Sequence, residues 1–292
     1  MSKACRVDAH FHQPPADLER FFTTFCFGSV ELSGQSFARD AMHPEWGTLR
    51  FFPDASPVIS MGEREDLSGA RFVASGPTSQ TMDYAMPESR FWGIGLLPLG
   101  WATFVGEPAH KMANALVDGS VHSTFTHFGK LAESLLDPML SEEAQLAAII
   151  DYFQNHAPRF GKEDPRIERI HDCLLQPDLP NVQAMADFCG IGGRTLERLC
   201  RKAFGFPPKL LLRRQRFMRS LAEYMLDPEA SWSDSIDALY YDQSHFVRDS
   251  HRFLGMTPGE YAALDHPILS GFMRDRARLR GSPVQTLDKP AG

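Results

Sequence analysis

The sequence predicts an α+β protein, in which a β-rich, barrel-like N-terminal domain is followed by helices and an all-α C-terminal domain of two similar units. Short apolar stretches between turn residues fill residues 1–140, and helical periodicity replaces them further on. Residues 192–211 recur at 242–261. The expected divisions are a β-rich domain over 1–140, a helical connector over 141–178, the two units over 179–266, and a basic, partly disordered tail over 267–292.

The N-terminal part is rich in Phe, Gly and Pro, and breaks such as Gly76-Pro77 separate its apolar stretches. This pattern favours a mostly antiparallel sheet or small barrel of about 100 residues. The large side chains Trp46, Arg50, Phe52, Trp92 and Trp101 are interpreted as core residues. The alternative is an apolar barrel mouth in which one Arg holds a small anionic ligand. Predicted strands cover residues 21–27, 48–52, 58–61, 70–74 and 92–97.

Two helices are expected in the connector. Ser141 followed by two glutamates is typical of a helix start, because the hydroxyl caps free N–H groups and acids favour the first turn. Asp164 and Pro165 supply the same signal for the second helix. Both helices carry apolar stripes that could pack on the sheet or on a second copy of the chain. A homodimer through residues 141–176 is therefore a candidate.

The repeat aligns without a gap at an offset of fifty residues. Each copy is a basic amphipathic helix that ends at Gly, after which Pro opens another helix. Asn181 and Asp242 are the expected caps of helices in the two units, and residues 232–240 are the expected scaffold helix of the second. A long helix over 208–226 joins the units, and Gly192-Gly193 suits the tight turn of a helix-turn-helix. Matching positions include Leu196 with Phe246, Arg198 with Arg248, Lys202 with Arg252 and Gly205 with Gly255.

Local charge favours double-stranded DNA as the partner, although the whole chain has a formal net charge of −7. Residues 194–219 contain nine basic residues and one acid, Glu197. Phosphate contacts depend on local charge, so a cationic surface beside an acidic domain is compatible with a duplex. The alternative is an ordinary solvated helix face.

Two basic helices on a long spacer suit successive major grooves. The spacer over 208–226 would be roughly 28 Å long at about 1.5 Å per residue, and grooves on one side of B-DNA recur about every 34 Å. Arg, Gln and Ser can read base edges. Base reading is assigned to Arg194, Glu197 and Arg198 in the first unit and to Gln243, Ser244 and Arg248 in the second; Arg201, Lys202 and Arg252 are assigned to phosphates.

Residues 181–261 resemble the C-terminal double helix-turn-helix domain of the arabinose-regulator (AraC/XylS) family. The likeness is strongest over 240–261, YYDQSHFVRDSHRFLGMTPGEY, and includes Leu196, Arg198, Gly205 and Arg216 in the first unit. The chain departs from the family at Cys200 and Ser250, where members usually have Phe. The resemblance implies a transcription regulator whose N-terminal domain senses a small-molecule effector or dimerises. RNA polymerase is a further candidate partner.

Other chemistry is less well supported. His10-Phe-His12 has a metal-binding spacing, with Asp8, His43 and Glu45 as weak candidates for further ligands, and we expect no metal and no cofactor. Phosphate-loop, dinucleotide and nucleophile-elbow motifs are missing from the sequence, so no catalytic residue is assigned. The five cysteines are unpatterned, and neither a signal peptide nor a membrane span is expected, which favours the cytoplasm. The alternative function is a β-barrel metalloprotein or enzyme fused to a DNA-binding module.

Overall fold

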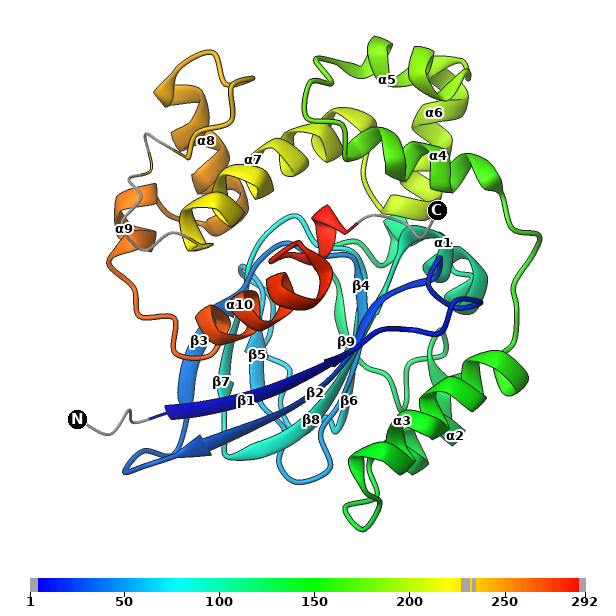
Figure 1. The fold of residues 1–292 in the computed structure, drawn as a ribbon, viewed down its shortest axis with the longest axis vertical. Helices are drawn as coiled ribbons and strands as arrows, with labels where there is room; N and C mark the ends of the chain where they lie inside the picture. Colours follow the sequence, from blue (N-terminus) through cyan, green and yellow to red (C-terminus); the bar gives the residue numbers. More distant parts are fainter. Residues whose placement is uncertain (1–4, 227–231, 233–234, 289–292) are drawn as a thin grey trace.

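The β-rich half of the chain forms two antiparallel sheets that face each other. A computed structural model describes residues 5–226, 232 and 235–288. The larger sheet has the order β1-β2-β8-β4-β6-β9 and the smaller one β3-β7-β5. The helices of the C-terminal half lie across one end of these sheets, while α2 and α3 lie at the other (Figure 1). The predicted α+β class, with a sheet-rich first domain and helical second domain, is confirmed.

The five predicted strands are present, and the structure adds four more in the described residues. The missed strands β1, β3, β7 and β9 are short or carry charged residues, so their alternation is weak. The strand bounds are β1 Cys5–His12, β2 Phe22–Leu32, β3 Ala38–Met42, β4 Gly47–Phe51, β5 Val58–Ser60, β6 Phe72–Ser75, β7 Met82–Met86, β8 Ser89–Leu96 and β9 Leu116–Asp118.

Aromatic side chains fill the interior of this half. The antiparallel pair β2 and β8 places Phe25 opposite Ile94 and Phe27 opposite Trp92. Trp46, Trp92 and Trp101 are each at most 1% exposed, as expected for core residues. Burying aromatic rings of this size supplies much of the apolar area that stabilises the domain.

The two connector helices start where the sequence predicts, but only the first packs on its own sheet, while the second packs mainly with helices of the C-terminal domain. Ser141 caps α3 (Glu142–Asp151) by accepting from the Ala144 N–H, and Asp164 caps α4 (Pro165–Leu174) in the same way. The Trp92 indole donates to Gln145 Oε1 of α3 at 2.7 Å. The remaining elements of this middle region are α1 Pro98–Gly100, η1 Trp101–Val105, η2 Ala109–Lys111, η3 Thr126–Phe128, α2 Gly129–Leu135 and η4 Tyr152–His156.

The C-terminal domain consists of two helical units at opposite ends of one long helix (Figure 1). Asn181 and Asp242 cap their helices as predicted, and Thr257 and Glu260 form a capping box. The predicted scaffold helix over 232–240 is wrong over its described part: residues 235–240 are not helical, and residues 233–234 lie outside the described part of the chain. The bounds are α5 Val182–Cys189, α6 Gly193–Leu199, η5 Cys200–Phe204, α7 Pro208–Leu226, α8 Gln243–Leu254 and α9 Pro258–Ala262.

The segment expected to be a partly disordered basic tail is ordered over most of its length. Helix α10 (Leu269–Arg280) and the short turn η6 (Gln285–Leu287) return to the N-terminal domain. Figure 1 shows α10 lying across the sheets, beneath α7. Asp40 fixes its start by accepting from the backbone N–H groups of Ile268 and Leu269, at 2.9 and 2.8 Å. Arg276, one of the supposed tail arginines, is 5% exposed.

Candidate nucleic-acid interface

The first predicted reading face is exposed. Leu196 and Leu199 point into the core, which leaves the opposite side of α6 and η5 in solvent. Arg194, Arg198, Arg201 and Lys202 are exposed there. Glu197 binds Arg201 Nε at 2.8 Å, which is one of the two roles that the sequence allows for it. Four cations of one helix end therefore face outward together.

The second predicted reading face has fewer charges. Gln243, Ser244, Arg248 and Arg252 are exposed on α8. Phe246 and Phe253 lie on the other side, where they pack against Phe217 of α7 at ring-centroid distances of 5.7 and 5.3 Å. The structure thus places all the predicted reading residues of this unit on one outward-facing helix.

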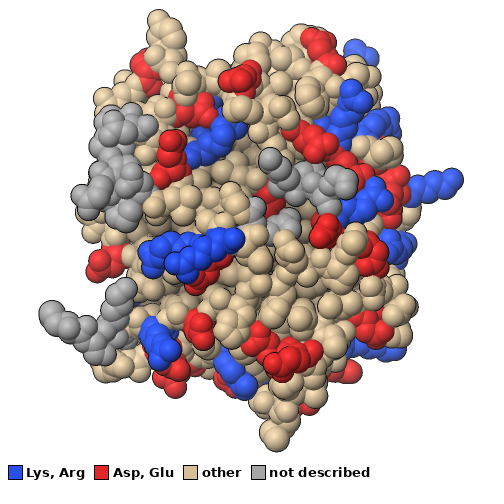
Figure 2. Space-filling model, in the orientation of Figure 1, with Lys and Arg blue, Asp and Glu red and all other residues tan. Residues whose placement is uncertain are grey.

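Arginines of the linker helix α7 bind other parts of the protein, whereas the number of charges in the sequence indicates a DNA-facing surface. Arg213 binds the buried carboxylate of Asp249, and Arg219 binds Asp237 Oδ2 at 2.6 Å. Arg216 lies over the Tyr240 ring, and Arg214 is fully buried. Arg213, Arg216 and Arg219 thus contact the second unit, and Arg214 contacts the β-rich domain. The positive charge that faces solvent is therefore smaller than the sequence predicts. Over the face drawn in Figure 2, basic and acidic side chains are interspersed.

The first unit meets the β-rich domain through Arg214. Its guanidinium stacks on Trp46, 3.9 Å from the ring centroid, and donates to the Thr78 carbonyl at 2.8 Å. Burial lowers the pKa of Arg214 to about 9, so it stays charged at neutral pH. Gly205 lies beside this contact at a φ of +83°, and a Cβ there would be 2.5 Å from Pro77 Cγ. Glycine is required both for this backbone conformation and for the close approach.

The second unit meets the same domain through α8 and α9. The Thr81 N–H donates to the Phe253 carbonyl at the end of α8, at 3.0 Å. The His43 ring is 2.7 Å from the Tyr261 hydroxyl of α9. Burial lowers the pKa of His43 to about 3, so this imidazole is neutral. Both units are therefore seated on the β-rich domain.

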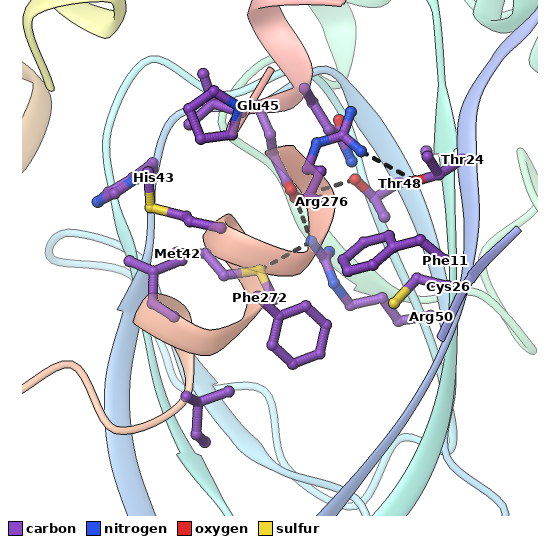
Figure 3. A pocket seen from close by; sticks show the side chains of 18 of the residues that line it. Phe11, Thr24, Cys26, Met42, His43, Glu45, Thr48, Arg50, Phe272 and Arg276 are labelled. Carbon is purple, nitrogen blue, oxygen red and sulfur yellow. Dashed lines mark hydrogen bonds and ion pairs between the residues drawn. The ribbon is translucent and has the colours of Figure 1, made fainter. Parts of the chain in front are cut away.

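A cavity of about 140 Å³ lies between the two sheets and the C-terminal segment. Met42, Tyr84 and Phe91 from the strands and Phe272 from α10 form much of its apolar wall. Figure 3 shows Arg50 of β4 and Arg276 of α10 reaching the same region, close to Glu45, Thr24 and Thr48. Arg50 forms an ion pair with Glu45, so its charge is already compensated.

The His10 and His12 rings point to the same side of β1, as the alternation of a strand requires. Both bind Glu142 of α3, His10 through Nδ1 at 2.9 Å and His12 through Nε2 at 2.8 Å. His43 and Glu45, which were candidates for further ligands, lie elsewhere, at the cavity. Within the described residues, no group of three or more His, Cys, Asp or Glu is arranged to hold a metal ion. None of the described helices is long and apolar enough to cross a membrane.

Sequence reasoning missed the contribution of the C-terminal segment to the cavity. Ile268, Phe272, Met273 and Arg276 follow a helical spacing of four, five and eight residues, which would have indicated a helix with one buried face. Four arginines at every second position, from 274 to 280, obscured that signal. The buried pairing of Asp249 with Arg213 has no local sequence signal, because its partners are 36 residues apart.

Comparison with known proteins identifies the C-terminal domain. Residues 185–263 match a family model described as a helix-turn-helix domain. This domain is of the AraC type, as the resemblance implies, and belongs to a class that binds DNA in transcription regulators. No curated protein matches the chain.

Solved structures with a similar fold include ToxT from Vibrio cholerae, at 10% identity and a TM-score of 0.44, over 89% of this chain and 98% of that one. A wild-type ToxT from strain SCE256 bound to an unsaturated fatty acid aligns at 12% identity and a TM-score of 0.40, over 89% and 95%. The AraC-like transcriptional activator CuxR aligns at 13% and 0.27, over 74% and 87%.

Proposed function

We propose that this protein is a sequence-specific DNA-binding transcription regulator that reads two successive major-groove segments and responds to a small molecule bound in its N-terminal domain. The observation that carries the proposal is the pair of outward-facing polar helices, α6 with η5 and α8, at opposite ends of the 19-residue helix α7. A rigid helix of this length, roughly 28 Å, suits two grooves about 34 Å apart.

In this proposal Arg194, Arg198, Gln243 and Arg248 read bases, because Arg pairs with guanine and Gln with adenine in the major groove. Glu197 either accepts from cytosine or keeps Arg201 in position, and Ser244 reads either kind of base. Arg201, Lys202 and Arg252 bind phosphates, which fixes the register of the protein on the duplex.

The proposed control by a small molecule is supported by the short segment between β3 and β4. His43 and Glu45 both line the cavity. His43 also binds Tyr261 of the second unit, and the Glu45 carbonyl lies 3.4 Å from the Arg214 guanidinium of the linker. A ligand that shifts this segment would change contacts to both ends of the reading module, which is the differential contact that allosteric control requires.

Selection of bound DNA from a random library tests the proposal. We expect enrichment of two half-sites about ten base pairs apart, centre to centre. Arg198→Ala and Arg248→Ala should each relax one half-site, whereas Lys130→Ala, an exposed cation of α2 at the other end of the sheets, should leave the enriched sequence unchanged. Failure of the wild type to enrich any sequence at moderate salt would contradict the proposal.

RNA polymerase and a second copy of the chain remain candidate partners of this regulator. Helix α3 and the turn η4 that follows it pack on their own sheet through Gln145 and Phe153, and the Phe153 and Phe22 ring centroids are 4.5 Å apart. Helix α4 packs mainly with the helices of the C-terminal domain. A dimer through 141–176 would therefore use the outer faces of these connector helices. Light scattering of the purified protein, with and without operator DNA, tests for the dimer.

A further inference from the structure

The size of the cavity limits what it can hold. Its volume is about 140 Å³, and apolar cavities of about 150 Å³ accept benzene. Aromatic rings and thioethers surround it, including Phe11, Phe91, Phe272, Met42 and Met86. The cavity thus suits an apolar body of one ring.

The charges around the cavity cancel. Arg50 is paired with Glu45, and Arg276 with the buried Asp288. The Cys26 thiol stays protonated, since burial raises its pKa well above its ordinary value. A ligand carboxylate would lose its hydration, meet two cations that are already neutralised, and lie close to Glu45. Desolvation and like-charge repulsion both oppose its entry.

Three buried polar atoms at the cavity have no hydrogen-bond partner among the described residues: Arg276 Nε, Gln285 Oε1 and His43 Nδ1. Arg276 Nε is a donor and Gln285 Oε1 an acceptor. The Tyr261 hydroxyl donates to Met225 Sδ and so accepts from His43 Nε2, which makes His43 Nδ1 an acceptor as well. Unpaired buried groups of this kind are costly, and a ligand that pairs with them recovers that cost.

We propose that the cavity binds a small neutral alcohol or phenol, whose ring fills the apolar part and whose single hydroxyl accepts from Arg276 Nε and donates to Gln285 Oε1. One hydroxyl supplies both the donor and the acceptor that this set lacks. The assignment rests on the proposed function for its role as an effector, and it revises the small anionic ligand that the sequence alone brings into view.

Calorimetric titration of the full chain with three probes that share one phenyl ring tests the ligand class. Benzyl alcohol is expected to bind at least tenfold more tightly than benzoate, and several-fold more tightly than toluene, which lacks the hydroxyl. Binding of benzoate as tight as that of benzyl alcohol, or no heat with benzyl alcohol at millimolar concentration, overturns the proposal.

Two variants locate the site. A Cβ at Gly93 would meet no atom closer than 4.0 Å, so Gly93→Leu should fill the cavity without disturbing the strand and abolish binding of benzyl alcohol. Gly129→Leu, where a Cβ has nothing within 4 Å and no contact with the cavity, is the matched control and should bind normally. Gln285→Leu should reduce the preference for benzyl alcohol over toluene. Undiminished binding by folded Gly93→Leu would refute the location.

The DNA selection is scored separately from the titration. A chain that enriches no DNA yet binds benzyl alcohol in this cavity keeps the ligand class and loses the regulator function. A chain that enriches two half-sites but prefers benzoate keeps the function and loses the ligand class.

Discussion

The two helical units share a sequence repeat but differ in what holds their reading helices. At matching positions the first unit has Leu199 and the second has Asp249, and both side chains are buried. At this position the first helix has apolar packing, whereas the second has a carboxylate that binds Arg213 of the linker and the Tyr240 hydroxyl, in addition to the packing of Phe246 and Phe253. The first unit also has four exposed cations to the second unit's two. A repeat can therefore preserve a shape while its copies divide affinity and specificity differently.

Replacing the buried carboxylate of Asp249 is expected to have the largest effect, which is on the free energy of unfolding. Asp249→Asn should lower the free energy of unfolding of the second unit by about 3–5 kcal/mol, because it leaves the Arg213 charge without its partner. Leu199→Ala should cost about 2–5 kcal/mol in the first unit, through lost packing alone. Hydrogen exchange, which reports each unit separately, measures both. If either substitution lowered the stability of both units equally, the two reading helices would not be held independently, contrary to the comparison.

Salt dependence measures the division of charge. Alanine at Arg201 and Lys202 together should reduce the slope of log affinity against log salt by roughly 2, because each phosphate contact contributes about 0.9. Alanine at Arg252, the residue of the second unit that is assigned to phosphate, should reduce it by roughly 1. Fluorescence anisotropy on operator DNA over a range of salt concentrations gives both slopes. Equal reductions would mean that the first unit does not dominate the electrostatic attraction.

Base reading by the second unit is expected to have a smaller effect. Arg248→Ala should weaken binding to the specific site by about 1–3 kcal/mol, since it removes a guanine contact. Arg252→Ala, on the same helix, should instead weaken binding about equally for all sequences, because it contacts phosphate. Binding to the operator and to a scrambled duplex distinguishes the two. The assignment fails if Arg248→Ala binds the operator as the wild type does.

The smallest effect, per pH unit, concerns the seating of the two units. One buried histidine lies at each junction: His171 beside Trp46 and Arg214, and His43 beside Tyr261. Burial lowers the pKa of each to about 3. Below pH 6.5 the two histidines bind protons in the unfolded chain but stay neutral in the folded chain. The free energy of unfolding therefore decreases as the pH falls toward 3, by about 1.4 kcal/mol per pH unit for each histidine.

Urea unfolding at several pH values should show this slope reduced by the same amount in His171→Gln and in His43→Gln. His156→Gln, whose side chain is 55% exposed, is the control and should keep the wild-type slope. A reduction in only one of the two variants would mean that one unit leaves the β-rich domain in solution.

Sequence reasoning predicted the C-terminal domain well because its signals are local. The Asn181 and Asp242 caps, the capping box at Thr257 and the long helix after Pro207 each lie within a few residues of the structure they determine. The cavity could not be predicted in this way, because Glu45 and Arg50 lie more than 200 residues before Arg276 and Gln285 in the chain. The same holds for Arg214, whose charge indicates a solvent-facing residue although Trp46 buries it.

The return of α10 to the sheets makes the reading module an insertion in the chain. The polypeptide leaves the β-rich domain at α4 and returns to it at the start of α10, which Asp40 of β3 binds. The module is thus covalently tethered at both ends. If one unit separates from the β-rich domain, the two chain connections keep it close to that domain. Its return is then an intramolecular event at high effective concentration. Deleting α10 would convert this doubly anchored segment into an ordinary terminal domain, with one linker and more freedom to move.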